Sequence, residues 1–178
     1  DYRGVNISSL DLSGQDLSTA LFDNTTVFSS LVNGYRVGAN LLGTNAKLTG
    51  LSLQQTDFRG VNLAGVDLSN CILTIPLTSN STNNQVSKLT ALFDSTTIFS
   101  GIHPVTGDRV SANLSNFTGN GATLTGSYPG TDFRGVNLAG ADLSESDLRQ
   151  STFDDTTIFS MVNPATGQSV GANLNLSL

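Results

Sequence analysis

The chain has 178 residues, the size of a single domain, with 14 acidic and 8 basic residues and a net charge of −6. It contains no basic patch, so binding to nucleic acid through charge is not expected. No apolar run approaches the roughly 20 residues of a membrane-spanning helix, so membrane insertion is not expected either. The single cysteine excludes an internal disulfide.

The chain repeats itself along its length. It opens with Asp1-Tyr2-Arg3-Gly4-Val5-Asn6-Ile7, a loose copy of residues 56–65, and residues 131–140 repeat residues 56–65 letter for letter. Repetition of this kind predicts a stack of similar units, a solenoid, and not one irregular core. We therefore expect a single domain over residues 1–178, built from three modules at about residues 1–42, 56–114 and 131–174.

A period of five residues runs through each module. A large apolar residue recurs at every fifth position, with Asp or Asn often one position before it and a small or β-branched residue two before it. The period fits neither an α-helix nor a plain strand. It suits short extended segments that alternate with corners, in which the large residue and the small one point inward. The three apolar series are Tyr2, Ile7, Leu12, Leu17, Phe22, Val27; Leu48, Leu53, Phe58, Leu63, Leu68, Leu73; and Phe133, Leu138, Leu143, Leu148, Phe153, Ile158.

This pattern resembles the motif of the pentapeptide-repeat family, which is Ala, then Asp or Asn, then Leu, then two variable residues. The resemblance covers about two thirds of the chain. It implies an all-β fold, a right-handed quadrilateral β-helix with four pentads per coil and the Leu and Phe residues at its centre. It also implies a bacterial, especially cyanobacterial, source. The clearest pentads are Ala141-Asp142-Leu143-Ser144-Glu145, Val61-Asn62-Leu63-Ala64-Gly65, Val136-Asn137-Leu138-Ala139-Gly140 and Ala39-Asn40-Leu41-Leu42-Gly43.

The period breaks three times, each time after a similar octet: residues 22–29, 93–100 and 153–160. Each octet leads into a segment rich in turn-forming residues, and each of these segments ends at Ala-Asn-Leu. Pro and Gly within a short segment that has apolar ends predict a lateral loop or hairpin. We expect three such excursions, projecting from related faces of the rod. The middle module also carries a polar insert, Thr78 to Gln85, which predicts a surface loop.

Few residues offer catalytic or metal-binding chemistry. Cys71 and His103 are the only thiol and imidazole, and a Cys–His pair is possible, but Cys71 falls at an inner position of the repeat and is better explained as a core residue. Asp154 and Asp155 adjoin, and we interpret them as turn residues in preference to a calcium site. Arg3, Arg59 and Arg134 recur at the same place in each module, and we expect each to pair with a neighbouring acid and not to form an anion-binding row. No catalytic, cofactor-binding or metal-binding residue is assigned.

These observations favour a non-catalytic structural or interaction solenoid, whose partner is itself or another protein. The chain starts in mid-pattern at Asp1, Tyr2 and Arg3 and finishes in apolar alternation at Leu174, Leu176 and Leu178, with no cap at either side. We therefore expect head-to-tail stacking of copies into a filament through these six residues, the alternative being a segment of a longer solenoid.

Two other functions stay open. The resemblance implies that an acidic solenoid can act as a DNA mimic that binds a topoisomerase, although those relatives dimerise through a C-terminal helix that is not evident here. The excursions, with Tyr35 and His103, could instead bind glycans or another surface. An extracellular or cell-surface location is slightly favoured over a cytoplasmic one.

Overall fold

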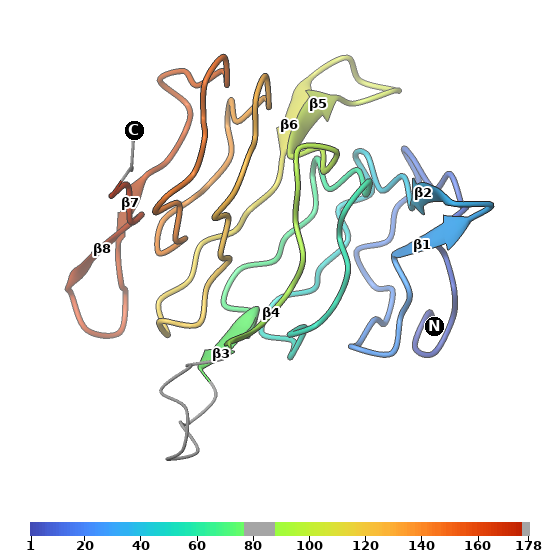
Figure 1. The fold of residues 1–178 in the computed structure, drawn as a ribbon, viewed down its shortest axis with the longest axis horizontal. Helices are drawn as coiled ribbons and strands as arrows, with labels where there is room; N and C mark the ends of the chain where they lie inside the picture. Colours follow the sequence, from blue (N-terminus) through green and yellow to red (C-terminus); the bar gives the residue numbers. More distant parts are fainter. Residues whose placement is uncertain (77–87, 176–178) are drawn as a thin grey trace.

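The computed structural model describes residues 1–76 and 88–175, so the predicted loop from Thr78 to Gln85 lies outside the described residues. Within the described part the chain is all-β and contains no helix that could cross a membrane. The chain winds into successive coils that lie side by side along the long axis (Figure 1). The expected architecture, a right-handed quadrilateral β-helix, is confirmed.

Parallel bridges between neighbouring coils define the coil length. Lys47 pairs with Asp67, and Ser52 pairs with Ile72, in each case twenty residues further along the chain. Four pentads therefore complete one coil. At the corners an Asp or Asn side chain accepts the N–H two residues later, as when Asp67 accepts from Ser69 N at 3.0 Å, which turns the chain without a long loop.

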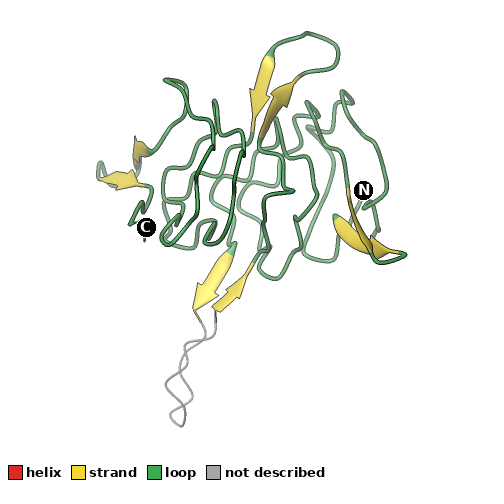
Figure 2. Ribbon diagram, turned by 45° about the horizontal axis from the view of Figure 1, so that its top comes forward, coloured by secondary structure: helices red, strands yellow, loops and turns green. Residues whose placement is uncertain are grey.

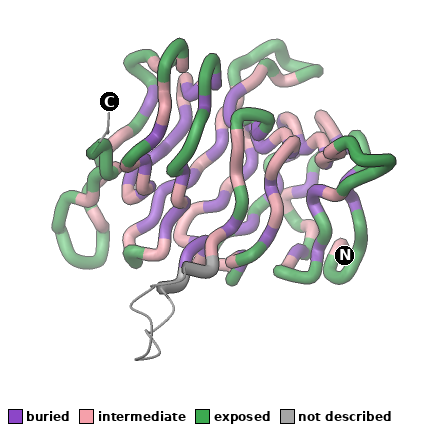
Figure 3. The backbone as a smooth tube through the Cα atoms, viewed as in Figure 1, coloured by how far each residue is buried: buried purple, intermediate pink, exposed green. Residues whose placement is uncertain are grey.

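The core contains most of the large residues that the period of five predicted. Val27 and Ile158 are exceptions, 39% and 38% exposed, because the next residue in each octet, Phe28 or Phe159, turns inward instead. Leu63, Leu68, Leu138 and Leu143 have no exposed surface, and neither do Phe58 and Phe133. The small residues two positions before them are buried too, including Val61, Val66, Val136, Ala141 and Cys71. Buried segments accordingly alternate with exposed corners in every coil (Figure 3).

An unbroken series of aromatic rings runs through this core. Successive rings lie with centroids 5.2 to 6.0 Å apart, so each one contacts the next. Each octet supplies two of the rings, and the Asp-Phe-Arg-Gly or Asp-Tyr-Arg-Gly segment supplies the one before them. We call this series the aromatic ladder; its members are Tyr2, Phe22, Phe28, Phe58, Phe93, Phe99, Phe133, Phe153 and Phe159.

The three excursions are antiparallel hairpins. They pair β1 (Ser29–Val32) with β2 (Tyr35–Gly38), β5 (Ser100–Ile102) with β6 (Arg109–Ser111), and β7 (Ser160–Val162) with β8 (Ser169–Gly171). A fourth pair, β3 (Thr74–Pro76) with β4 (Lys88–Thr90), stands at the base of the middle insert.

The expectation that the excursions leave from related faces is wrong. The hairpin β1–β2 ends before Asn40, which is bridged through Asn62 to Ile98, the residue from which β5–β6 departs shortly afterwards. In the same way β5–β6 ends before Asn113, which is bridged through Asn137 to Ile158, where β7–β8 departs. Each hairpin therefore starts on the face where the previous one ended, one corner further round, and the hairpins leave the rod on different sides (Figure 2). The reason is that the chain between two hairpins completes whole coils, from Asn40 to Ile98 and from Asn113 to Ile158, while each hairpin itself takes the place of one corner.

Candidate functional site

The ion pairs and side-chain hydrogen bonds between distant parts of the chain are concentrated where one module meets the next. The hairpin β1–β2 lies on residues 57–60, and β5–β6 lies on the matching residues 132–135. We call these two contacts the module seams. Each consists of a carboxylate shared by two arginines, a serine bonded to a backbone carbonyl, and a pair of core aromatic rings.

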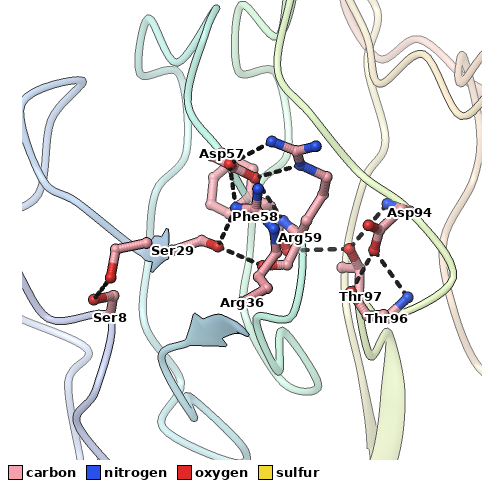
Figure 4. Close-up of polar contacts among 10 residues, drawn as sticks. Ser8, Ser29, Arg36, Asp57, Phe58, Arg59, Asp94, Thr96 and Thr97 are labelled. Atoms are coloured by element: carbon pink, nitrogen blue, oxygen red, sulfur yellow. Dashed lines mark hydrogen bonds and ion pairs between the residues drawn. The ribbon is translucent and has the colours of Figure 1, made fainter. Parts of the chain in front are cut away.

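Asp57 is the carboxylate of the first seam (Figure 4). It accepts from Arg59 Nε at 3.0 Å and Nη2 at 2.8 Å, and from Nη1 of Arg36 on β2 at 2.6 Å. Burial alone would raise the pKa of Asp57, but the hydrogen bonds from Arg59 and the charges of both guanidiniums lower it. Ser29 at the start of β1 donates to the carbonyl of Arg59 at 2.6 Å and so completes the seam.

Asp132 repeats the arrangement in the second seam. It accepts from Arg134 Nη2 at 2.7 Å and from Nη1 of Arg109 on β6 at 3.1 Å. The hydrogen bond from Arg134 is the main cause that lowers the pKa of Asp132. Ser111 donates to the carbonyl of Arg134 at 2.8 Å.

Asp1 holds Arg3 in the same fork but binds no second arginine among the described residues. The expectation that Arg3, Arg59 and Arg134 pair with neighbouring acids is therefore confirmed. Sequence reasoning missed Arg36 and Arg109. The available signal was their common place, three residues before Ala39 and Ala112, where the third module has Ser169.

The octets fasten each coil to the one before it. In the second octet Asp94 accepts from Thr96, and Thr97 Oγ1 donates to the carbonyl of Phe58 at 3.0 Å (Figure 4). Thr26 and Thr157 make the same bond to the carbonyls of Tyr2 and Phe133. Asp154 is occupied in the same way by Thr156, which supports its interpretation as a turn residue. In residues 1–76 and 88–175 no three His, Cys, Asp or Glu side chains cluster as metal ligands would.

The structure gives Cys71 and His103 separate surroundings. The Cys71 thiol is buried and donates to the carbonyl of Leu48 at 2.7 Å, and burial raises its pKa to about 12, which disfavours the thiolate that nucleophilic chemistry needs. The His103 ring lies in the turn of β5–β6 and bonds to the carbonyl of Gly43. No contact joins the two side chains in the described part of the chain.

A surface cavity of about 440 Å³ lies between residues 90–93, where the second octet begins, and residues 123–125 and 142–145. Leu92, Phe93, Thr125 and Glu145 contribute to its wall. Here no backbone hydrogen bond links residues 91–93 to residues 123–127, both described.

The pentapeptide-repeat model matches the chain in eight copies, over residues 37–74 and 111–156. Together with the observed coil of four pentads, this match decides the family. The chain belongs to the pentapeptide-repeat family. The matched segments leave out residues 1–36, 75–110 and 157–178, and with them nearly all of the hairpins β1–β2, β5–β6 and β7–β8.

Three solved structures are similar to this pentapeptide-repeat protein. HetL, involved in heterocyst differentiation regulation in the cyanobacterium Nostoc sp. strain PCC 7120, is 21% identical over 87% of this chain and 52% of HetL, with a TM-score of 0.26; the chain thus spans about half the length of HetL. Rfr23 from the cyanobacterium Cyanothece 51142 is 16% identical, covering 87% of this chain and 88% of Rfr23, with a TM-score of 0.23. QnrB1, a plasmid-mediated fluoroquinolone resistance protein, is 15% identical over 86% of each chain, with a TM-score of 0.23. No curated protein matches the chain in sequence.

Proposed function

We propose that this protein is a non-catalytic structural solenoid that acts by contact with other protein surfaces, and that copies of it stack head to tail. The observation that carries the proposal is the module seam. Its polar groups hold one unit of the stack on the next, and its aromatic rings continue the core across the contact. The charged and hydroxyl side chains that could have taken part in catalysis are thus engaged in holding the modules of the chain together.

The third module offers a surface that resembles the exposed half of a seam. Phe28 contacts Phe58 at 5.2 Å in the first seam, and Phe99 contacts Phe133 at 5.3 Å in the second. Phe159 occupies the matching place in the third module and contacts Phe153 at 5.5 Å. Tyr2, which corresponds to Phe58 and Phe133, would extend the aromatic ladder if it came from a second copy.

The other self-association residues fit this arrangement. The segment Asp1-Tyr2-Arg3 corresponds to residues 57–59 and 132–134, on which the hairpins lie in the two seams. Leu174 is 44% exposed beside the third hairpin. Leu176 and Leu178 lie outside the described residues. Because Ser169 stands where the internal seams have an arginine, the joint between copies lacks the second ion pair and should be weaker than an internal seam.

Sedimentation at several protein concentrations, with electron microscopy at the highest, tests the stacking. We expect the mean mass to rise with concentration and unbranched fibres one solenoid wide to form. Tyr2→Ala should reduce the association, whereas Tyr35→Ala, which removes a ring that is 78% exposed on the first hairpin, should not. A monomer of constant mass over the whole range would overturn the stacking.

Ser169→Arg sharpens the same test, because it supplies the missing second arginine for Asp1 of the next copy. We expect stronger association in this variant, and its loss when Asp1→Asn is added. Cys71→Ala should leave the association unchanged, as expected for a thiol with no catalytic part. Loss of association in Cys71→Ala with the fold intact would contradict the non-catalytic reading.

A further inference from the structure

The turn of hairpin β5–β6 is built around the imidazole of His103. Its Nδ1 accepts the backbone N–H of Val105 at 3.1 Å and that of Thr106 at 3.2 Å, while Nε2 lies 3.1 Å from the carbonyl oxygen of Gly43. Two donors directed at Nδ1 require that it carry no proton. The single proton of the neutral ring is therefore on Nε2, which donates it to Gly43.

The hairpin is fitted closely to the coils on which it lies. A Cβ on Gly43 would stand 2.3 Å from Cδ2 of His103, and a Cβ on Gly14 would stand 3.0 Å from Cγ of Pro104. Gly14 and Gly43 are neighbouring corners, because Gly14 N donates to the carbonyl of Leu42. The hairpin accordingly leans along the rod toward the N-terminal coils (Figure 1).

The third hairpin contains the same turn with a different acceptor. In β7–β8 the place of His103 is taken by Asn163, whose Oδ1 accepts the N–H of Ala165 at 2.9 Å. The N–H of Gly167 bonds to the carbonyl of Asn163 at 2.8 Å, as the N–H of Gly107 bonds to that of His103 at 3.0 Å. An amide performs this role at any ordinary pH, so a histidine is not needed to form the turn.

No ion pair of the described residues ties the ring to a neighbouring charge. On its own hairpin the charged groups are Asp108, which is exposed, and Arg109, which binds Asp132. On the coil that carries Gly14 they are Asp11, bonded to Ser13 and Asn40, and Asp16, bonded to Ser18. The segment around Gly43, residues 41–45, has no charged side chain.

We propose that hairpin β5–β6 is a pH-operated strap. With His103 neutral, the strap is closed on the corners at Gly43 and Gly14. Protonation places an N–H on Nδ1 that faces the backbone N–H groups of Val105 and Thr106. Nδ1 can then no longer accept from them, so the turn loses both hydrogen bonds and the strap opens. Opening moves Pro104 and Val105 off Gly14 and the His103 ring off Gly43, so it uncovers the two glycine corners.

Amide hydrogen exchange and NMR spectra of the whole chain between about pH 8 and about pH 5, the range in which an ordinary histidine titrates, test this. We expect the protection factors of Val105 and Thr106, corrected for intrinsic exchange rates, to fall by about tenfold or more toward the acid end. That of Ala165 should hold. At the alkaline end the ring nitrogen shifts should show the Nε2–H tautomer.

Two exchanged variants serve as controls. His103→Asn should make the protection of Val105 independent of pH, and Asn163→His should transfer the pH dependence to Ala165. Unchanged signals of the aromatic ladder in both variants verify that the fold is intact. An Nδ1–H tautomer at alkaline pH, constant protection in the natural chain, or the same pH dependence in His103→Asn would overturn the proposal. The outcome is independent of whether copies of the protein stack.

Discussion

Hairpins β5–β6 and β7–β8 have the same Pro-x-Thr-Gly turn, but they are attached to the rod differently. In both, the last turn residue is held by a threonine hydroxyl, at 3.3 Å from Asp108 N and from Gln168 N. Side chains that reach the body differ: His103 and Arg109 have become Asn163 and Ser169. In β7–β8 Met161 reaches the body instead, where its Sδ accepts from Nδ2 of Asn137 at 2.9 Å. Ser100 at the start of β5 is buried, whereas its counterpart at the start of β7 is exposed. The turn is thus a local property, and docking depends on a few long side chains.

Hairpin β1–β2 shows the opposite combination: its turn differs from that of β5–β6, but it docks on the rod in the same way. Its turn is the two-residue Asn33-Gly34, with φ of 51° and 81°, as a tight hairpin requires. Yet Arg36 joins the seam as Arg109 does, and a Cβ on Gly38 would stand 2.2 Å from the carbonyl of Gly60. A different turn therefore coexists with the same docking.

The largest expected effect follows from removing the aromatic ring of Phe133 from the seam under β5–β6. Phe133 is fully buried and contacts Phe99 and Phe153, each at 5.3 Å. Phe133→Ala should lower the free energy of unfolding by about 3–5 kcal/mol, because the rod has no second layer that could fill the space. Phe159→Ala, at the partly exposed ring of the third module, should cost clearly less in the same urea denaturation. Equal losses would show that the aromatic ladder is not what joins the modules.

A second, smaller effect should follow from Gly43→Ala. Gly43 and Gly50 have φ of 66° and 69°, so alanine strains the backbone at both positions by about 1–2 kcal/mol. A Cβ at Gly50 would meet nothing within 4 Å, whereas at Gly43 it would displace His103. We expect Gly43→Ala to be the more destabilising of the two and to deprotect only the β5–β6 turn in hydrogen exchange. Equal effects on both measurements would contradict the fit of the strap.

Asp132→Asn should lower the free energy of unfolding by about 1 kcal/mol at neutral pH, since the carboxylate is partly exposed and serves two arginines. The pKa of Asp132 is lowered in the folded chain. Its contribution is therefore complete above about pH 4 and is lost as the pH falls through the lowered value. The acid limb of a stability–pH curve should become shallower in the variant. Asp147→Asn is the control, because Asp147 binds only Arg149, which is 86% exposed; a loss as large as that of Asp132→Asn would count against the seam.

The smallest expected effect is a gain. Thr56 and Thr131 precede the two seam aspartates, and their hydroxyls are buried with no partner among the described residues. Replacing either with Val removes a buried group that forms no hydrogen bond, so stability should be unchanged or rise by up to about 1 kcal/mol. Thermal melting of both single variants checks this. A loss of stability in both would reveal a hydrogen-bond partner for the hydroxyls.

The period of five was enough to predict the coils, because an inward Leu such as Leu138 is set by its spacing alone. The pairs of Arg59 and Arg134 were predictable as well, since their acids lie two residues away. The corner from which each hairpin departs depends on the sum of all pentads and irregular segments before it, among them the step of four residues between Leu124 and Tyr128. The effect of such small deviations on the corner that the chain has reached does not follow from the sequence pattern.

The seam partners were hidden for a related reason. Arg36 reaches Asp57 across 21 positions of sequence, and His103 reaches Gly43 across 60. Nothing in the local pattern marks such contacts. Only the winding of the solenoid brings these residues together. It also places the imidazole of His103 against Gly43, which by sequence is an ordinary corner glycine.

Hydrogen exchange of the three hairpins at one alkaline pH, read by mass spectrometry, tests most directly the claim that side-chain anchors determine how firmly a hairpin is held. The account predicts slow exchange in β1–β2 and β5–β6 and fast exchange in β7–β8, despite the turn that the last two share. It also predicts that the double variant His103→Asn with Arg109→Ser exchanges in β5–β6 at the rate of β7–β8. Equal rates in β5–β6 and β7–β8 of the natural chain would contradict it.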